Sequence, residues 1–237
     1  FKINEDIVIP LSALPEFALF LEQLNIECMA RAYRRAMQEV GRLKGMAEDD
    51  KEFNREFTYA SRIIKGEQDL GGMSDQELQL HAVLFLGSLK EKYPHLSAKI
   101  EKIEERMLAS QVVVASHMHA GDGNCHVNMP VNSGDADMLS EAEQVAERVM
   151  HKAKELGGEI SGEHGIGITK IAFQDEHKIK SMREFKEQVD PRNIINPAKL
   201  TRRELPVAPF AFSCNRLIQD LRQSGLPGKE HLIELLS

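Results

Sequence analysis

The chain has 237 residues, of which 42% are hydrophobic and 28% charged, a composition typical of a soluble globular protein. Its formal net charge of -7 and the lack of a long basic run argue against nucleic acid as the main partner. No apolar run reaches the roughly 18–20 residues that a membrane span needs, and three scattered cysteines exclude a disulfide framework or a cysteine-type zinc or iron–sulfur site.

The N-terminal part of the chain predicts one strand followed by helices. Residues 1–10 (FKINEDIVIP) are rich in β-branched side chains and end at Pro10. Apolar residues then recur at helical spacing over 14–21, and a second helical pattern runs over about 25–46. We therefore expect a strand and two successive helices.

A polar stretch of helical character extends over about residues 47–110. Within it Ser74 and Glu77 have the spacing of a capping box and open an apolar helix, which Pro94 ends. The next helix carries a single apolar stripe, which contains Leu96, Ile100, Ile103 and Met107. We interpret residues of about 25–110 together as a helical insertion.

A β-hairpin is predicted after this insertion. Residues 111–119 (QVVVASHMH) change to β-branched residues with the period of a strand. The segment GDGN (121–124) is a strong turn signal, and CHVNMPV (125–131) returns as a second strand. We expect these two strands to pair with each other in antiparallel fashion.

The segments after the hairpin predict two further helices separated by a glycine-rich loop. SGDAD (133–137) opens a helix that Gly157 and Gly158 end. EISGEHGIG (159–167) predicts a short strand entering the loop, and another helix is expected from about Thr169.

The order of these elements predicts an α+β fold. It would contain one antiparallel sheet with helices packed on one face, plus the helical insertion. DPRNIINPAK (190–199) is rich in turn residues, and residues 201–237 have the character of a linker followed by a helical tail.

Three histidines surround the predicted hairpin turn, and they make it a candidate metal site. His119 and His126 are seven residues apart, so the turn can bring their imidazoles to one rim, and Glu163 can add a carboxylate from another segment. Two histidines and one carboxylate suit zinc, and also iron or manganese, with a position left open for a substrate. The alternative is a polar hairpin with surface histidines, and the spacing alone leaves both open.

His164, next to Glu163, is a candidate general base. Neighbours in an extended segment point to opposite sides, so both side chains reach one substrate only where the backbone bends, which the flanking glycines permit. A histidine beside a cation has its imidazolium form disfavoured and stays basic near neutral pH. Such a histidine can remove a proton from a hydroxyl group.

Three motifs occur in the order found in one enzyme family. They are HAGDGNCH (119–126) with a following Asn128, SGEHGIGITK (161–170) and DPRNIINPAK (190–199). They resemble the C-terminal part of FAD-linked 2-hydroxy-acid dehydrogenases, which are vanillyl-alcohol-oxidase type flavoproteins that include D-lactate dehydrogenases and glycolate oxidase flavoprotein subunits. The opening residues 1–17 are similar to the strand and helix of the family's ferredoxin-like cap domain. The resemblance covers about residues 1–24 and 111–200.

The resemblance implies FAD-dependent oxidation of a D-2-hydroxy acid of the lactate or glycolate class to the 2-oxo acid. The implied ligands of a divalent metal, with zinc as the expected ion, are His119, His126 and Glu163. His164 would remove the hydroxyl proton while a hydride leaves for the flavin. Lys2 and Asn128 would lie near the substrate, with Lys2 paired to its carboxylate, and Asn196 would lie close to the flavin.

The resemblance also implies how the chain relates to its partners. Residues 1–200 would form the FAD-linked oxidase C-terminal domain, whereas the family's FAD-binding domain precedes this region. We therefore expect a fragment of a longer protein that binds FAD weakly and is inactive alone. A downstream electron-transfer domain or subunit is a further expected partner. The expected location is cytoplasmic, with peripheral attachment to a membrane through the electron acceptor as an alternative.

Two other functions remain open at this point. The His117 and His119 pair on one strand resembles a hydrolase ligand pair, so a metal-bound water could attack an ester or amide. The long helical insertion and the acidic balance favour, instead, a non-catalytic interaction module with a structural metal. Cys125 stands where the family usually has an aliphatic residue, and we interpret it as a small buried hydrophobe.

Overall fold

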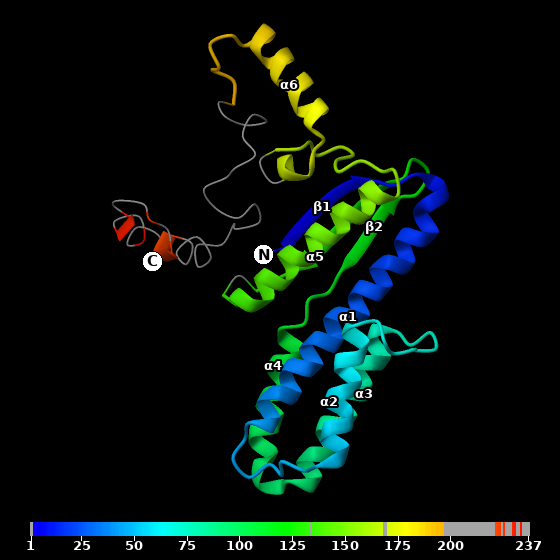
Figure 1. Cartoon of the computed structure of the whole chain (residues 1–237), viewed down its shortest axis with the longest axis vertical. Helices are drawn as coiled ribbons and strands as arrows, with labels where there is room; N and C mark the ends of the chain where they lie inside the picture. The colour runs from blue at the N-terminus through cyan, green and yellow to red at the C-terminus, as the bar shows by residue number, and fades with distance from the viewer. Residues whose placement is uncertain are drawn as a thin grey trace. The chain divides into compact units, whose positions relative to one another are not determined.

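The computed structural model describes three long segments of the chain and isolated positions near its C-terminus. These are residues 2–132, 134–167 and 170–196, and positions between 221 and 233. They form two compact units, which we describe one at a time (Figure 1). The sheet unit comprises residues 1–17 and 115–237, and the helical unit comprises residues 18–114. Most of the tail predicted over 201–237 lies outside the described residues.

The sheet unit contains a three-stranded antiparallel sheet. Its strands are β1 (Lys2–Val8), β2 (Ala115–His119) and β3 (Asn124–Pro130), in the spatial order β1-β3-β2. The predicted hairpin is formed by β2 and β3, and the start of the chain adds β1 on the other side of β3. The α+β class and the antiparallel sheet are thus confirmed.

The two faces of this sheet differ in chemistry, because successive strand residues point to opposite sides. The buried face consists of Ile3, Glu5, Ile7, Cys125, Val127 and Met129. Helix α5 (Ala136–Glu155) packs against β1. The opposite face is polar and presents Lys2, Asn4, Asp6, His117, His119, Asn124, His126 and Asn128. The five histidine and asparagine positions that β2 and β3 contribute therefore share one face.

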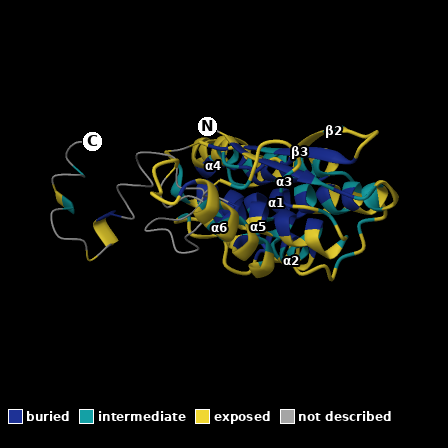
Figure 2. Ribbon diagram, turned by 90° about the horizontal axis from the view of Figure 1, so that it is seen from above, coloured by how far each residue is buried: buried dark blue, intermediate teal, exposed yellow. Residues whose placement is uncertain are grey.

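The start of α5 follows the sequence prediction. The Asp135 side chain accepts the Met138 N–H at 2.9 Å, so it forms the N-cap that SGDAD predicts. Gly157, with φ of +76°, follows the end of the helix. Most of the apolar stripe of α5 is buried, and Figure 2 shows the contrast between buried and exposed sides of the helices.

Two strand predictions were too long. The strand expected over 111–119 begins only at Ala115. Before it, the N–H and carbonyl groups of Val114 are bonded to the Asn25 side chain rather than to a neighbouring strand. The short strand expected where the segment EISGEHGIG (159–167) begins is reduced to an isolated bridge between Val8 and Glu159. Beyond it, backbone N–H groups donate to a carboxylate rather than to a neighbouring strand.

The helix expected from about Thr169 begins later. Thr169 itself lies outside the described residues, Ile171–Phe173 form a 3-10 turn, and α6 runs over Glu176–Val189. Lys170 donates from Nζ to the Asp6 carbonyl oxygen at 2.6 Å. The backbone becomes extended at Gln174, with ψ of 148°, so the 3-10 turn does not continue into α6.

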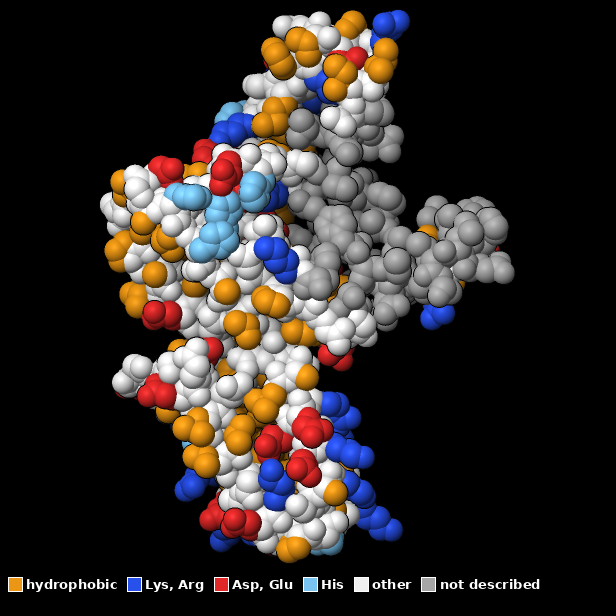
Figure 3. Space-filling model, turned by 180° about the vertical axis from the view of Figure 1, so that it is seen from behind, with side chains coloured by type: hydrophobic (Ala, Val, Ile, Leu, Met, Phe, Trp, Pro, Cys, Tyr) orange, Lys and Arg blue, Asp and Glu red, His pale blue; other side chains and the backbone are white. Residues whose placement is uncertain are grey.

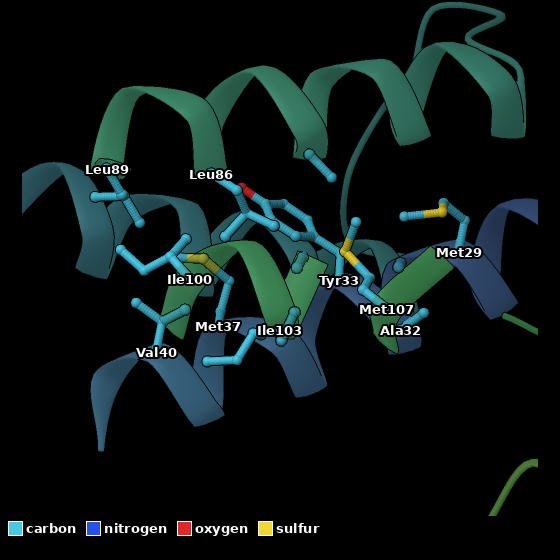
Figure 4. Close-up of a cluster of buried hydrophobic side chains, with 14 of the residues drawn as sticks. Met29, Ala32, Tyr33, Met37, Val40, Leu86, Leu89, Ile100, Ile103 and Met107 are labelled. Carbon is cyan, nitrogen blue, oxygen red and sulfur yellow. The ribbon is translucent and has the colours of Figure 1, made fainter. Parts of the chain in front are cut away.

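The helical unit contains most of α1 and three further helices. They are α1 (Leu14–Gly41), α2 (Lys51–Ile64), α3 (Asp75–Lys92) and α4 (Ser97–Ala109). Their apolar sides form one core, in which Tyr33, Met37, Leu86 and Ile100 lie close together (Figure 4). The stripe predicted on the last helix is buried in this core.

The capping box predicted at the start of α3 is confirmed. Ser74 accepts the Glu77 N–H, and the Glu77 carboxylate accepts the Ser74 N–H in return. The two helices predicted over 14–46 are in fact the single helix α1. Asn25 does not interrupt it, because its amide is satisfied elsewhere: it donates to Val114 O at 2.9 Å and accepts the Val114 N–H at 2.7 Å. Within the described residues, each helix is too short or too polar to cross a bilayer.

Candidate active site

His126 lies at the centre of a cluster of histidines on the polar face of the sheet. Its residue exposure is 5%, and its ring stacks on that of His117 at 4.8 Å between centroids. The His119 ring meets it edge-on at 5.7 Å, and the His164 ring lies 5.0 Å away. Figure 3 shows the histidine side chains gathered in one patch, with acidic side chains beside it. The turn therefore does bring the hairpin histidines together.

Glu163 joins this cluster from the loop that follows α5. Its Oε1 lies 2.9 Å from His126 Nε2 and 3.9 Å from His119 Nε2. Asn124 Nδ2 also donates to this oxygen at 2.9 Å. The three groups singled out as metal ligands thus offer ligand atoms that all lie within 4.8 Å of one another.

The donor set and spacing fit a divalent metal. Ligand atoms around a tetrahedral zinc stand roughly 3.3 Å apart, since the bonds measure about 2.0–2.2 Å. The two distances from Glu163 to the histidines lie on either side of that value. Buried oxygens without a hydrogen-bond partner in the described chain, Asp6 Oδ1 and Asn124 Oδ1, border the same place. Two imidazoles and a carboxylate are a donor set that suits zinc, and also iron or manganese.

The SGEH segment bends sharply, as it must if Glu163 and His164 are to reach one substrate. Asp6 Oδ2 accepts three consecutive backbone N–H groups, from Gly162 at 2.9 Å, Glu163 at 2.9 Å and His164 at 2.8 Å. The Ser161 hydroxyl donates to the same oxygen at 3.3 Å. Successive N–H groups that converge in this way form an anion-binding concavity.

The charge of Asp6 is stabilised by this arrangement. Burial disfavours the charged form, but the backbone N–H groups of His164, Glu163 and Gly162, together with the Lys170 ammonium, hold the pKa of the Asp6 carboxyl below its ordinary value. Lys170 is itself buried, and burial lowers its pKa. Its Nζ lies 3.6 Å from Glu5 Oε2. A buried lysine therefore stands directly behind the polar face.

The two predicted substrate-contacting residues lie on the same face as the histidines. Asn128 pairs through Nδ2 with His117 Nδ1 at 3.2 Å, and its Oδ1 is buried without a hydrogen-bond partner among the described residues. Lys2 is exposed on β1. It lies two residues before Asn4, which is paired with Asn128, so its side chain is on the same face. A positive charge and an unpartnered amide oxygen thus border the histidine cluster.

Asn196 lies apart from the sheet, at a hollow beside α6. The hollow has a volume of about 460 Å³, is lined in part by Gly165, Phe185 and Asn196, and lies next to the SGEH segment. Asn196 is exposed and has a φ of +45°. The turn before it is held by Asp190, which accepts N–H groups from Ile194 and Ile195 at 2.9 Å each.

Cys125 takes no part in this site. It points to the buried face, is 0% exposed, and among the described residues its Sγ makes a weak contact with Gly123 O at 3.6 Å. Burial raises the pKa of its thiol. The interpretation as a small buried hydrophobe agrees with this environment.

Sequence reasoning missed Asp6, Asn124, Glu5 and Lys170. Asp6 carried a usable signal, because a strand with two consecutive acidic residues must place one of them on each face of the sheet. Its partner loop could not be identified that way, since it lies more than 150 residues further along the chain.

Comparison with known proteins identifies the family. Residues 22–200, most of the chain, match the family model of the C-terminal domain of FAD linked oxidases, and this chain belongs to that family. The matched range includes residues 22–114 of the helical unit.

Sequence similarity to individual curated proteins supports this membership. The chain is 33% identical over 105 residues to glycolate oxidase subunit GlcD of Bacillus subtilis, covering 43% of this chain and 22% of that protein. It is 33% identical over 169 residues to a D-lactate dehydrogenase of Archaeoglobus fulgidus, covering 62% and 38%. A mitochondrial D-lactate dehydrogenase (cytochrome) of Arabidopsis thaliana is 30% identical over 110 residues, covering 45% and 19%. The chain therefore spans well under half the length of these relatives.

Proposed function

We propose that this chain is the substrate-binding and catalytic C-terminal part of a FAD-dependent oxidoreductase that oxidises a D-2-hydroxy acid to the 2-oxo acid. The substrate would belong to the lactate and glycolate class named for the relatives. The observation that carries the proposal is the meeting of the hairpin histidines with the Glu163–His164 loop on one polar face.

A divalent metal and FAD would each supply part of the chemistry. A divalent metal, zinc first, would act as a Lewis acid on the substrate oxygens, and FAD, held mainly by another domain, would accept the hydride from the alpha carbon. The metal would be held by His119, His126 and Glu163, whose ligand atoms lie within 4.8 Å of one another. Asn196 would contribute to the flavin side, at the hollow beside α6.

His164 would be the general base. Its ring lies beside His126 and its side chain is exposed, so a substrate hydroxyl can approach it. It would take the hydroxyl proton as the alpha carbon loses its hydride, and the two losses together convert the C–OH group to the carbonyl group of the 2-oxo acid. The bent backbone lets His164 and Glu163 serve the same substrate.

Lys2 and Asn128 would orient the substrate. The Lys2 ammonium suits the substrate carboxylate, and a charge-assisted contact of this kind is stronger than a neutral hydrogen bond. The Asn128 amide, paired with His117, would contact a polar group of the substrate beside the metal. A downstream electron-transfer domain or subunit would reoxidise the flavin.

Family membership favours oxidation over the metallohydrolase alternative. A hydrolase would also use the metal, but it would have no need of FAD. A non-catalytic module with a structural metal would bind the ion without any turnover. Reduction of a redox dye by D-lactate or glycolate, compared with hydrolysis of generic esters, separates these three functions.

The test replaces His164 in the flavin-containing enzyme that includes this chain. We expect His164→Ala to reduce kcat for D-2-hydroxy acids by at least about 100-fold, the usual contribution of a general base, with flavin content unchanged. His177→Ala, an exposed histidine of α6, is the matched control and should retain wild-type kcat. An unchanged kcat in His164→Ala would remove His164 from the mechanism.

A further inference from the structure

Asp6 is the most completely buried charged side chain on the polar face of the sheet. Its exposure is 0%, and its two carboxylate oxygens have different surroundings. Oδ2 accepts the N–H groups of Gly162, Glu163 and His164 and the Ser161 hydroxyl. Because four donors surround Oδ2, this oxygen has no capacity left for a further ligand.

Asp6 Oδ1 faces the hairpin instead. It lies 3.8 Å from His126 Nδ1 and has no hydrogen-bond partner among the described residues. The other ring nitrogen, His126 Nε2, lies 2.9 Å from Glu163 Oε1. The His126 ring therefore has Asp6 behind it and the proposed metal position in front of it. The two atoms are at ion-pair distance rather than hydrogen-bond distance. A carboxylate that accepts the N–H of the second ring nitrogen commonly fixes the orientation and the tautomer of a metal-binding histidine.

We propose that Asp6 is a positioning residue: one of its oxygens holds the loop that carries Glu163 and His164, and the other orients the His126 ring. This inference rests on the proposed function, since it concerns the same metal site. Asp6 thereby joins a ligand on the hairpin to a ligand and a base on a distant loop. One buried carboxylate sets the distance between the two halves of the site.

The geometry favours this role over direct metal binding by Asp6. Asp6, His126 and His164 also offer atoms within 4.8 Å of one another, so a metal among them is conceivable from spacing alone. However, Oδ2 is saturated with donors, and Oδ1 lies on the Nδ1 side of His126, away from Glu163. The pair His119 and Glu163 on the Nε2 side is exposed and open to substrate.

The close packing of the loop on Asp6 supports an anchoring role. A Cβ atom on Gly162 would lie 2.9 Å from Asp6 Oδ1 and 2.3 Å from Asn124 Oδ1, so only glycine fits there without a shift. On the far side, Lys170 donates to the Asp6 carbonyl oxygen at 2.6 Å. The loop and the strand thus meet without intervening space.

The first variant is Asp6→Asn, which keeps the size of the side chain and removes its charge. The amide oxygen can still accept loop N–H groups, but the amide NH₂ would face His126 Nδ1. Nδ1 would then have to accept, and the ring proton would move to Nε2, the atom needed for the metal. We expect zinc to bind 10- to 100-fold more weakly, as for other residues that orient metal ligands.

Two measurements distinguish a positioning role of Asp6 from a purely structural role. The amide proton shifts of Gly162, Glu163 and His164 in the zinc-free protein report the hydrogen bonds to Asp6, and competition with a chromophoric chelator reports the zinc Kd. Asp50→Asn is the matched control, because Asp50 is also buried and accepts a backbone N–H, from Phe53, but lies in the helical unit. It should lower thermal stability and leave the zinc Kd unchanged.

Gly162→Ala is a second variant, which tests the same role of Asp6 if Asp6→Asn folds poorly. The added methyl displaces the loop from Asp6 without removing the carboxylate, and it should weaken zinc binding by a similar factor. Zinc affinity within twofold of wild type in both variants would overturn the positioning role, even if the amide shifts move. A wild-type zinc Kd that His126→Ala leaves unchanged is a different result, because it would overturn the proposed metal site itself.

Discussion

Glu5 and Asp6 are neighbours on β1, and their environments move the two carboxyl pKa values in opposite directions. Burial raises the pKa of Glu5 to about 7, although the nearby Lys170 ammonium opposes this shift. Asp6 is buried as well, but its N–H donors more than compensate, and its pKa is lowered. The stronger desolvation of Glu5 and the N–H donors around Asp6 together decide which of the two stays charged at neutral pH.

Glu5 should make the stability of the fold depend on pH. The folded state holds its proton more tightly than an unfolded chain, for which the glutamate pKa is 4.5. This contribution to the free energy of unfolding is fully present below pH 4.5 and is lost as pH rises through about 7. The loss amounts to roughly 3 kcal/mol when the pKa rises from 4.5 to about 7.

Urea unfolding between pH 4.5 and 8 measures this effect. Wild type should lose stability across the interval relative to Glu5→Gln, which has no proton to release. Glu101→Gln, an exposed glutamate of α4, is the control and should follow wild type. Parallel curves for wild type and Glu5→Gln would show that Glu5 does not titrate in this range.

Gly123 is the glycine that the hairpin turn requires. It has a φ of +80°, and a Cβ atom there would lie 2.1 Å from the Ile9 carbonyl oxygen. We expect Gly123→Ala to lower the free energy of unfolding by about 2 kcal/mol or more, the strain of a left-handed alanine plus the clash. Gly121→Ala, in the same turn with open space around it, should change it by less than about 0.5 kcal/mol. Denaturant unfolding of both variants checks this, and equal losses would contradict it.

At the scale of elements, local signals predicted the helices and strands that contain their own start and stop residues. Ser74 with Glu77, Asp135, and the GDGN turn each act within a few positions, and each is found where expected. The errors occurred where a distant partner took part. Asn25 stays within α1 because Val114 satisfies its amide, and the strand before Ala115 is cut short by the same contact.

Helix α3 shows how packing outweighs residue type. Leu86 is 0% exposed in the helical core, whereas Leu84, two positions earlier, is 65% exposed. Leu86→Ala should lower the free energy of unfolding by about 2–5 kcal/mol, because it removes buried apolar surface and leaves a cavity. Leu84→Ala, the same change on the outer side, should cost less than about 0.5 kcal/mol. Thermal or urea unfolding of the pair tests this, and a similar loss in both would mean that the outer side is covered in solution.

At the scale of the whole molecule, metal binding and folding should be coupled, because the proposed ligands come from segments far apart in the sequence. Zinc at 100 times its Kd should raise the free energy of unfolding by about 2.7 kcal/mol. Elemental mass spectrometry should find about one zinc per chain. His126→Ala should lose both the zinc and the gain, while His177→Ala should keep them. The same gain in His126→Ala would show that zinc binds elsewhere.

Several features of this protein are predictable from its amino-acid sequence alone. The hairpin, the helix caps, the buried stripe of α4 and the candidate ligands follow from residues a few positions apart, because turn chemistry and side-chain periodicity act over short distances. The family motifs could be recognised for the same reason, since each is a short continuous segment.

The way these segments meet required the folded chain. Asp6 precedes His164 by 158 residues, and only the pairing of β1 with β3 brings its carboxylate beneath the SGEH loop and behind His126. The opposite pKa shifts of Glu5 and Asp6 likewise depend on which face of the sheet is covered and which N–H groups arrive there. Residue types name the possible ligands, but burial, register and long-range hydrogen bonds determine how they are held.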